Sequence, residues 1–132
     1  MKKYIKIQFN MPGFHFWKKA PTQYSFLRNK HRHMFYWTVV VSVKDSDREI
    51  EFIDLKDWFM HFLKEEFGYL TGENQGFLNK HLDFGGLSCE NIAQATHDLV
   101  DKIDCDLMSS EQIKSIEVLE DNENGALIEF GD

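Results

Sequence analysis

The sequence is poor in cysteine, proline and long apolar runs, and each shortage excludes a class of protein. Two cysteines among 132 residues are too few for a disulfide framework, so a cytoplasmic protein is the default expectation. The longest apolar stretch, Met34 to Val41, is far shorter than the roughly 18–20 residues of a transmembrane helix. No apolar segment follows the basic N-terminal residues, so we expect no signal peptide. With only two prolines and eight glycines there is no linker-like segment, which predicts a single domain over residues 1–132.

Basic residues are also in short supply. The chain has 15 Lys+Arg against 22 Asp+Glu, a formal net charge of −7. This balance argues against non-specific binding to nucleic acid or to an anionic membrane, because both require clustered cations. Hydrophobic residues make up 42% of the chain and aromatic residues 14%, enough to build a core, so intrinsic disorder is not expected.

Alternating and amphipathic patterns predict an α+β domain. Alternation of apolar and polar residues predicts strands over Tyr4–Phe9 (ended by Pro12-Gly13), His33–Val43, Glu49–Ile53, Ile113–Leu119 and Ala126–Phe130. The helical periodicity predicts two helices, one capped by Asp54 and closed by Gly68, the other from Ser88 to Ile103. Residues 69 to 87 are expected to be irregular, and Asp45 to Asp47 to form a hairpin turn.

This order of elements favours one antiparallel sheet with two helices on one face. The other face is also predicted to carry aromatic and apolar residues, among them Tyr36 and Val40. One layer of two helices cannot cover both faces. Oligomerisation that closes several sheets into a barrel would cover the second face and remove the exposed sheet edges.

Three of the six histidines are candidates for a metal site. His31 and His33 are two residues apart at the start of a strand, so both side chains project from one face. His15 follows the first strand, and an antiparallel neighbour can bring it alongside. Three imidazoles with an open fourth position are typical of a catalytic or ligand-binding zinc. The alternative is a solvated polar pair at a strand start; His61 and His97, flanked by charges on the two helices, are expected at the surface.

These residues lie in segments that together resemble the 6-pyruvoyltetrahydropterin synthase and 6-carboxytetrahydropterin synthase family. That family has a zinc-binding His after its first strand and then a His-Gly-His pair, where this chain has His15 and His31-Arg32-His33. The further counterparts, in the same order, are Glu51-Phe52-Ile53-Asp54-Leu55-Lys56, Leu87-Ser88-Cys89-Glu90-Asn91, and Glu120 followed by Ala126. The resemblance spans nearly the whole chain.

The resemblance implies the T-fold (tunnelling fold): a four-stranded antiparallel sheet with two helices on one face, assembled into an oligomeric barrel. It implies a Zn²⁺ held by His15, His31 and His33, and Glu120 as the anchor of a pterin- or purine-like ring. A carboxylate suits this role because it accepts two parallel N–H bonds from an amino-pyrimidine edge. Ser88 and Glu90 are the further ligand-binding residues implied, in a pocket between subunits of a trimer, or of a hexamer built as a dimer of trimers. The alternative for Glu120 is an exposed turn residue beside Asp121.

The chain also departs from the family pattern. The family's catalytic Cys precedes its His-Gly-His pair, but no Cys occurs between Ser25 and Lys30. The family's Asp-His pair is blurred, so either His81 or Asp83 is the candidate catalytic base. Arg32 replaces the glycine of the His-Gly-His pair and can bind a phosphate or carboxylate, although a solvated charge is the alternative. Basic residues near this position hint at an anionic ligand such as a nucleotide: Lys18, Lys19, Arg28, Lys30 and Arg32.

Three functions therefore remain open from the sequence. The first is a zinc-containing T-fold protein that binds a pterin, purine or nucleotide without the standard pterin chemistry. The second is an active zinc-dependent lyase of the 6-carboxytetrahydropterin synthase type. The third is a structural oligomer without a ligand.

Overall fold

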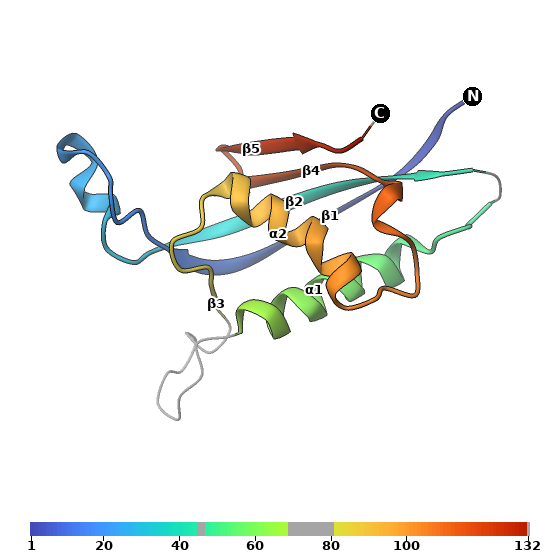
Figure 1. Cartoon of the computed structure of the whole chain (residues 1–132), viewed down its shortest axis with the longest axis horizontal. Helices are drawn as coiled ribbons and strands as arrows, with labels where there is room; N and C mark the ends of the chain where they lie inside the picture. The colour runs from blue at the N-terminus through green and yellow to red at the C-terminus, as the bar shows by residue number, and fades with distance from the viewer. Residues whose placement is uncertain (45–46, 69–80, 132) are drawn as a thin grey trace.

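The computed structural model describes residues 1–44, 47–68 and 81–131, and the account below concerns these residues. The chain folds as strand β1 (Lys3–His15), 3-10 helix η1 (Thr22–Leu27), strand β2 (His31–Val43) and helix α1 (Phe52–Phe67). It continues through strand β3 (Leu82–Asp83), helix α2 (Cys89–Lys102), 3-10 helix η3 (Ser110–Gln112), strand β4 (Ile113–Glu120) and strand β5 (Asn124–Glu129). The predicted α+β class is confirmed (Figure 1).

One five-stranded sheet, in the order β3-β1-β2-β4-β5, organises the domain. All neighbours are antiparallel except β1 and β3, which pair in parallel at Gly13–Leu82 and Phe14–Asp83. The predicted four-stranded sheet is therefore wrong by one strand. The additional strand is β3, which has two residues, too few to show an alternating pattern in the sequence.

Both helices pack on the same face of this sheet. Phe9 of β1 stacks on Trp37 of β2, at 5.1 Å between ring centroids, and also on Phe59 of α1, at 6.3 Å. The Trp37 indole N–H donates to the Thr96 hydroxyl of α2 at 3.1 Å, in the centre of the core. The core-facing residues of β2 are Phe35, Trp37, Val39 and Val41, each at most 1% exposed. They share a face because side chains alternate along a strand.

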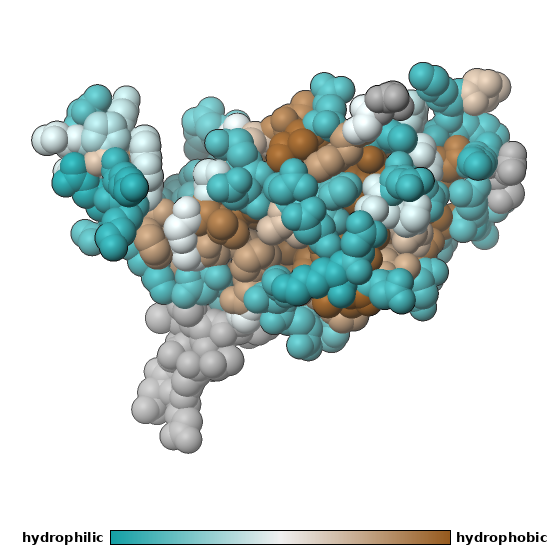
Figure 2. Space-filling view, viewed as in Figure 1, coloured by the Kyte–Doolittle hydropathy of each residue, from teal (hydrophilic) through white to brown (hydrophobic). Residues whose placement is uncertain are grey.

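The molecular surface on the side of the helices is mostly polar, with apolar patches between the elements (Figure 2). Neither α1 nor any other helix in the described ranges combines the length and apolar character that a membrane-spanning helix needs. The segment that carries η1 projects away from the sheet (Figure 1).

Strand β1 runs through Pro12-Gly13, so the predicted end of the first strand is wrong. Pro12 lies where β1 has only one neighbouring strand, a position at which a sheet tolerates a missing N–H. Gly13 lies directly under β3: a side chain there would meet Phe84 at 3.0 Å and the Leu82 carbonyl at 3.2 Å. The dipeptide therefore permits a close strand approach, and the strand continues to His15.

The predicted strand over Glu49–Ile53 is also wrong, because α1 begins at Phe52. Its N-cap is Glu51 in place of the predicted Asp54; the Glu51 carboxylate accepts a hydrogen bond from the Ile53 N–H. Strand β2 is already paired with β1 on one side and β4 on the other, which leaves no edge for residues 49–53. The predicted closure of α1 at Gly68, with φ of 61°, and the Ser88 cap of α2 are confirmed. The predicted hairpin turn and the irregular stretch fall partly on residues 45–46 and 69–80, outside the described residues.

Candidate metal centre and adjoining pocket

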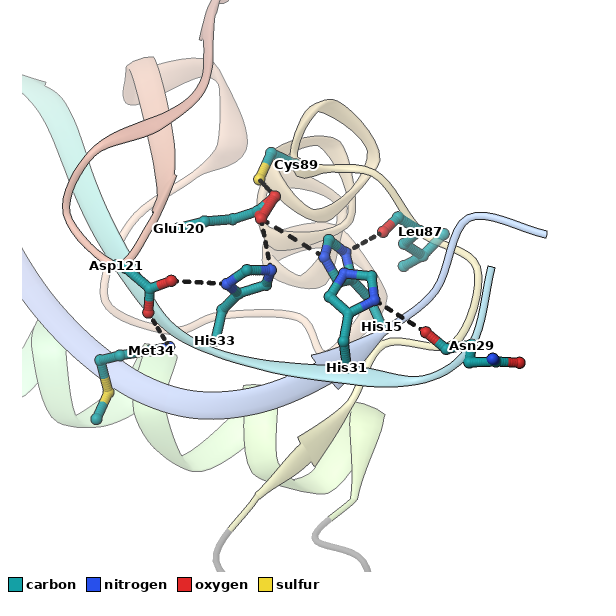
Figure 3. Close-up of polar contacts among 9 residues, drawn as sticks. All are labelled: His15, Asn29, His31, His33, Met34, Leu87, Cys89, Glu120 and Asp121. Atoms are coloured by element: carbon teal, nitrogen blue, oxygen red, sulfur yellow. Dashed lines mark hydrogen bonds and ion pairs between the residues drawn. The ribbon is translucent and has the colours of Figure 1, made fainter. Parts of the chain in front are cut away.

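Strands β1 and β2 bring three histidines together at one end of the sheet. His15 is the last residue of β1 and pairs directly with His31, the first residue of β2. His33 lies two residues further along β2, on the same face as His31. One ring nitrogen from each of the three lies within 4.8 Å of the others, as the three converging rings in Figure 3 show. The predicted juxtaposition of His15 with the His31–His33 pair is therefore confirmed.

The Nδ1 atom of each of these rings is bound to an oxygen acceptor. The partners are the Leu87 carbonyl for His15 at 3.0 Å, the Asn29 carbonyl for His31 at 2.9 Å and the Asp121 carboxylate for His33 at 2.7 Å. An oxygen acceptor requires a proton on Nδ1, so the network assigns the tautomer in which Nε2 of the neutral ring keeps its lone pair. Metal-binding histidines carry this arrangement of outer partners.

The Nε2 atoms of His15 and His33 are left without a hydrogen bond. Of the buried side-chain nitrogens and oxygens in the described chain, these two are the ones without a hydrogen-bond partner. A buried polar atom in this state costs about 1–3 kcal/mol, and a bound metal ion would remove that cost by taking the lone pair. Three imidazoles with fixed Nδ1–H groups fit Zn²⁺, which prefers nitrogen ligands at about 2.0–2.1 Å.

Glu120, at the end of β4, faces the same two orphaned nitrogens. Its Oε2 lies 2.9 Å from Nε2 of His33 and 3.7 Å from Nε2 of His15, without the alignment of a hydrogen bond. Its Oε1 accepts from the Cys89 thiol at a sulfur–oxygen distance of 3.7 Å. The Glu120 side chain is 29% exposed, so it lies between the histidines and the start of α2 with one side open to solvent (Figure 3).

The histidines and Glu120 shift one another's pKa values. Contact with His15 lowers the pKa of Glu120 below 4.5, and the positive charge of His33 adds to this effect against the opposing effect of burial. Burial of the His15 ring lowers its pKa, but contact with Glu120 and the Leu87 carbonyl outweighs burial, so the pKa of His15 lies above 6.5. In the metal-free site these shifts favour a protonated His15 facing the Glu120 carboxylate, whereas a bound metal ion would take the Nε2 lone pair of the neutral ring.

Cys89 is the cysteine next to the site, but its side chain is a protonated thiol near neutral pH. Burial, the neighbouring Glu120 charge and Glu90 raise the pKa of Cys89 to about 12. A nucleophilic or proton-accepting cysteine needs a lowered pKa. Cys89 therefore does not supply the reactive cysteine that the stretch from Ser25 to Lys30 lacks.

A pocket of about 550 Å³ adjoins the histidines. His15, His31 and Glu120 form one part of its lining, and the residues predicted to bind ligand from the start of α2, Ser88 and Glu90, form another. Its size lies within the usual range for small-molecule sites, about 300–1,000 Å³. Phe16 and Trp17, which follow β1, add planar apolar surface to the wall.

The candidate bases His81 and Asp83 lie with a different group of side chains. Nε2 of His81 accepts a hydrogen bond from the Arg32 guanidinium at 2.7 Å, and its ring packs against Phe14 at 5.1 Å. Arg32 and Phe14 alternate with the three histidines along β2 and β1, so they project from the opposite face of the sheet. Asp83 pairs with Lys30 at 2.7 Å. The predicted catalytic pair and the metal ligands thus do not converge on one site in this chain.

The basic residues predicted to attract an anion are partly engaged within the protein. Arg28 donates to the Ala20 carbonyl at 2.8 Å, while Lys30 and Arg32 bind Asp83 and His81. Lys18 and Lys19 are exposed on the segment between β1 and η1. His61 is exposed as predicted, whereas His97 is half-buried and stacks on Phe130 at 4.0 Å between ring centroids.

Asp121 is the site residue that the sequence reasoning missed. It is one of several acidic residues in the turn between β4 and β5, and such a sequence predicts exposed, solvated side chains. The Asp121 side chain is indeed 49% exposed. Its hydrogen bond to His33 and one to the Met34 N–H lower its pKa below 3.8. A long-range contact of this kind could be expected only after β2 and β4 were known to be neighbours.

The protonation states of this site predict how the metal-free protein responds to pH. A raised His15 pKa stabilises the folded state below pH 6.5, and this contribution is lost as pH rises through the raised value. A lowered Glu120 pKa contributes stability above pH 4.5 that is lost in acid as pH falls through the lowered value. We expect the melting temperature of chelator-treated protein to fall as pH rises above about 6.5, and to fall less in Glu120→Gln. An equal fall in both proteins would contradict the pairing of His15 with Glu120.

No family model and no curated protein sequence matches this chain. Two solved structures are similar to it over nearly the whole length. One is an uncharacterized protein from Wolinella succinogenes, with 14% identity, a TM-score of 0.60 and coverage of 98% of each chain. The other is 6-pyruvoyl tetrahydropterin synthase from Caenorhabditis elegans, with 11% identity, a TM-score of 0.64 and coverage of 99% of this chain and 97% of that chain. The chain therefore has the fold of a 6-pyruvoyl tetrahydropterin synthase, as the sequence resemblance implied.

Proposed function

We propose that this chain is a divergent T-fold protein that holds Zn²⁺ on His15, His31 and His33 and binds a pterin, purine or nucleotide beside the metal. The observation that carries the proposal is the pair of orphaned Nε2 atoms, on His15 and His33, in rings whose Nδ1 atoms are already committed. A zinc ion bound there would supply a fixed positive charge that polarises an oxygen or nitrogen of the ligand.

Glu120 is proposed as the anchor of the ligand ring. It lies on the wall of the pocket next to the histidines, and its lowered pKa keeps it ionised near neutral pH. An ionised carboxylate accepts two parallel N–H bonds from an amino-pyrimidine edge. Phe16 and Trp17 supply flat surface against which such a ring can pack, while Ser88 and Glu90 line the part of the pocket next to α2.

Binding is favoured over the lyase reaction by what surrounds the histidines. The thiol of Cys89 has its pKa raised to about 12. His81 accepts a hydrogen bond from Arg32, on the opposite face of β2. Asp83 is paired with Lys30, which precedes β2. Glu120 is the carboxylate that faces the Nε2 atoms of His15 and His33. If Glu120 anchors the ligand ring, it is not available for the proton transfer that the family's cysteine performs.

We further propose that the pocket is completed by a second copy of the chain in a cytoplasmic homo-oligomer, a trimer or a hexamer. Strand β5 is at the end of the sheet, so it has one free edge for pairing. The sheet face away from the helices carries Tyr4, half exposed, and Leu127, 56% exposed. An edge strand and exposed apolar side chains of this kind are covered when sheets associate, as in a barrel.

The proposal predicts that a guanine nucleotide or dihydroneopterin triphosphate raises the melting temperature of the zinc-loaded protein. A ligand at 100 times its dissociation constant stabilises the folded state by about 2.7 kcal/mol. Glu120→Gln should weaken binding by about 10–100-fold, because a hydrogen bond to a charged group contributes about 1.5–3 kcal/mol. The measurement is a thermal shift titration run in parallel with an assay for turnover of dihydroneopterin triphosphate.

A matched control is Glu65→Gln, the same change on helix α1. The Glu65 side chain is 66% exposed and lies away from the three histidines of the site and from the proposed subunit contact, so this change should leave ligand binding unchanged. Stabilisation without turnover supports the binding protein, and turnover supports the lyase. Zinc binding without stabilisation by any of these compounds would contradict the proposed ligand class.

A further inference from the structure

Two consecutive carboxylates contact opposite sides of one histidine ring. Glu120 lies 2.9 Å from Nε2 of His33, and Asp121 lies 2.7 Å from Nδ1. Neighbouring residues of a regular strand point to opposite faces, so this arrangement requires the strand to end between them. Asp121 has φ of 54°, in the left-handed region, which turns its carboxylate back toward β2. Asp and Asn adopt this conformation more readily than most other residues.

The Asp121 carboxylate is held in place by the backbone of β2. Its Oδ1 accepts the Met34 N–H at 2.9 Å, and its own N–H donates to the Met34 carbonyl at 2.7 Å. These two bonds fix the residue, and they leave Oδ2 directed at the ring of His33 (Figure 3). The contact is therefore built from the register of β2 and β4 and does not depend on a flexible surface side chain.

His33 is the member of the triad whose outer partner is charged. His15 and His31 each bind a neutral backbone carbonyl, from Leu87 and Asn29, whereas His33 binds a carboxylate. A carboxylate on the outer nitrogen orients a metal-binding imidazole and raises its basicity more than a neutral acceptor does. Glu120 does not have this role because it lies against Nε2, the nitrogen that faces the metal position.

We propose that Asp121 is a positioning residue of the metal centre, which orients His33 through Nδ1 and makes it the strongest of the three zinc ligands. The inference rests on the proposed metal centre and adds to it a specific role for a residue of the β4–β5 turn. It predicts that metal affinity depends on Asp121, which binds Nδ1 of His33 and not the Nε2 atom that would hold the metal.

Asp121→Asn tests this role with little disturbance of the backbone. Asparagine adopts the left-handed conformation as readily as aspartate, and its side-chain oxygen can still accept the Met34 N–H. Its amide nitrogen then takes the place of the oxygen that faces His33, so the change removes both the charge and the hydrogen-bond acceptor at Nδ1. Loss of such an outer partner typically costs about 10–100-fold in metal affinity. We expect zinc affinity, measured by competition with a chromophoric chelator, to fall by about this factor, and the d–d bands of the cobalt-substituted protein to shift.

The matched control is Glu123→Gln, which removes one negative charge from the same turn at an exposed position and should leave both readouts unchanged. A lower melting temperature of metal-free Asp121→Asn would not by itself support the inference, and the cobalt bands then decide, because a purely structural role leaves them unchanged. Wild-type affinity together with wild-type cobalt bands in Asp121→Asn would overturn the inference. Failure of the wild-type chain to bind zinc would instead overturn the proposed function.

Discussion

His33→Ala is expected to abolish stable zinc binding, the largest functional effect of any single change considered. The substitution removes one of the three proposed ligands, and it also leaves the Asp121 carboxylate without its His33 partner. Since loss of an outer partner alone costs about 10–100-fold in affinity, loss of the ligand itself should cost more than about 100-fold. Isothermal titration of the metal-free protein with zinc measures the change directly.

His61→Ala is the matched control for this experiment. His61 lies on α1 with a side chain that is 63% exposed; its Nε2 lies 3.7 Å from Glu65, and its ring lies against that of Phe62. The same substitution there should leave zinc affinity unchanged. Retention of wild-type zinc affinity in His33→Ala would place the metal elsewhere and contradict the three-histidine centre.

Phe35→Ala is expected to cause the largest loss of stability linked to the site. Phe35 is fully buried and forms the apolar floor under the histidines, with its ring 5.3 Å from that of His15 and 5.9 Å from that of His33. It also packs against Phe84 at 5.0 Å. Removal of a buried phenylalanine side chain costs about 3–5 kcal/mol, because it adds a cavity to the loss of apolar burial.

A loss of this size is a large part of the total stability of a domain, which is typically about 5–15 kcal/mol. Urea unfolding of the metal-free protein should show a lower midpoint with an unchanged slope. The control is Phe26→Ala on η1: the Phe26 side chain is 70% exposed, so its loss should change stability by no more than about 0.5 kcal/mol. A cost below about 1 kcal/mol for Phe35→Ala would contradict the tight packing beneath the site.

The core of the fold was predictable because its strands and helices follow regular periods. The alternation of Phe35, Trp37 and Val39 marks the buried face of β2, and the spacing of Leu55, Phe59 and Leu63 marks that of α1. The strand predictions were wrong at two places where contacts with a neighbouring strand, and not the local sequence pattern, determine the structure. Pro12-Gly13 remains in β1 because β3 needs a residue without a side chain beside it, and residues 49–53 do not form a strand because β2 has no free edge.

The site was predictable in part for the same reason. His31 and His33 share a face by strand alternation, and the antiparallel register then places His15 opposite His31. The hydrogen bond that Asp121 accepts from His33 depends on the pairing of β4 with β2 and on the left-handed conformation of Asp121, and a local sequence pattern does not reveal the strand pairing. The placement of His81 and Asp83 follows from the parallel pairing of β3 with β1. Strand β3 has only two residues, which is too short for a recognisable sequence pattern.

The central claim is that His15, His31 and His33 hold a metal ion together. X-ray absorption at the zinc edge, combined with metal analysis of dialysed protein, tests it most directly. We predict one zinc per chain, with three imidazole nitrogens at about 2.0–2.1 Å. Substoichiometric zinc, or a zinc shell without imidazole nitrogen, would contradict the claim.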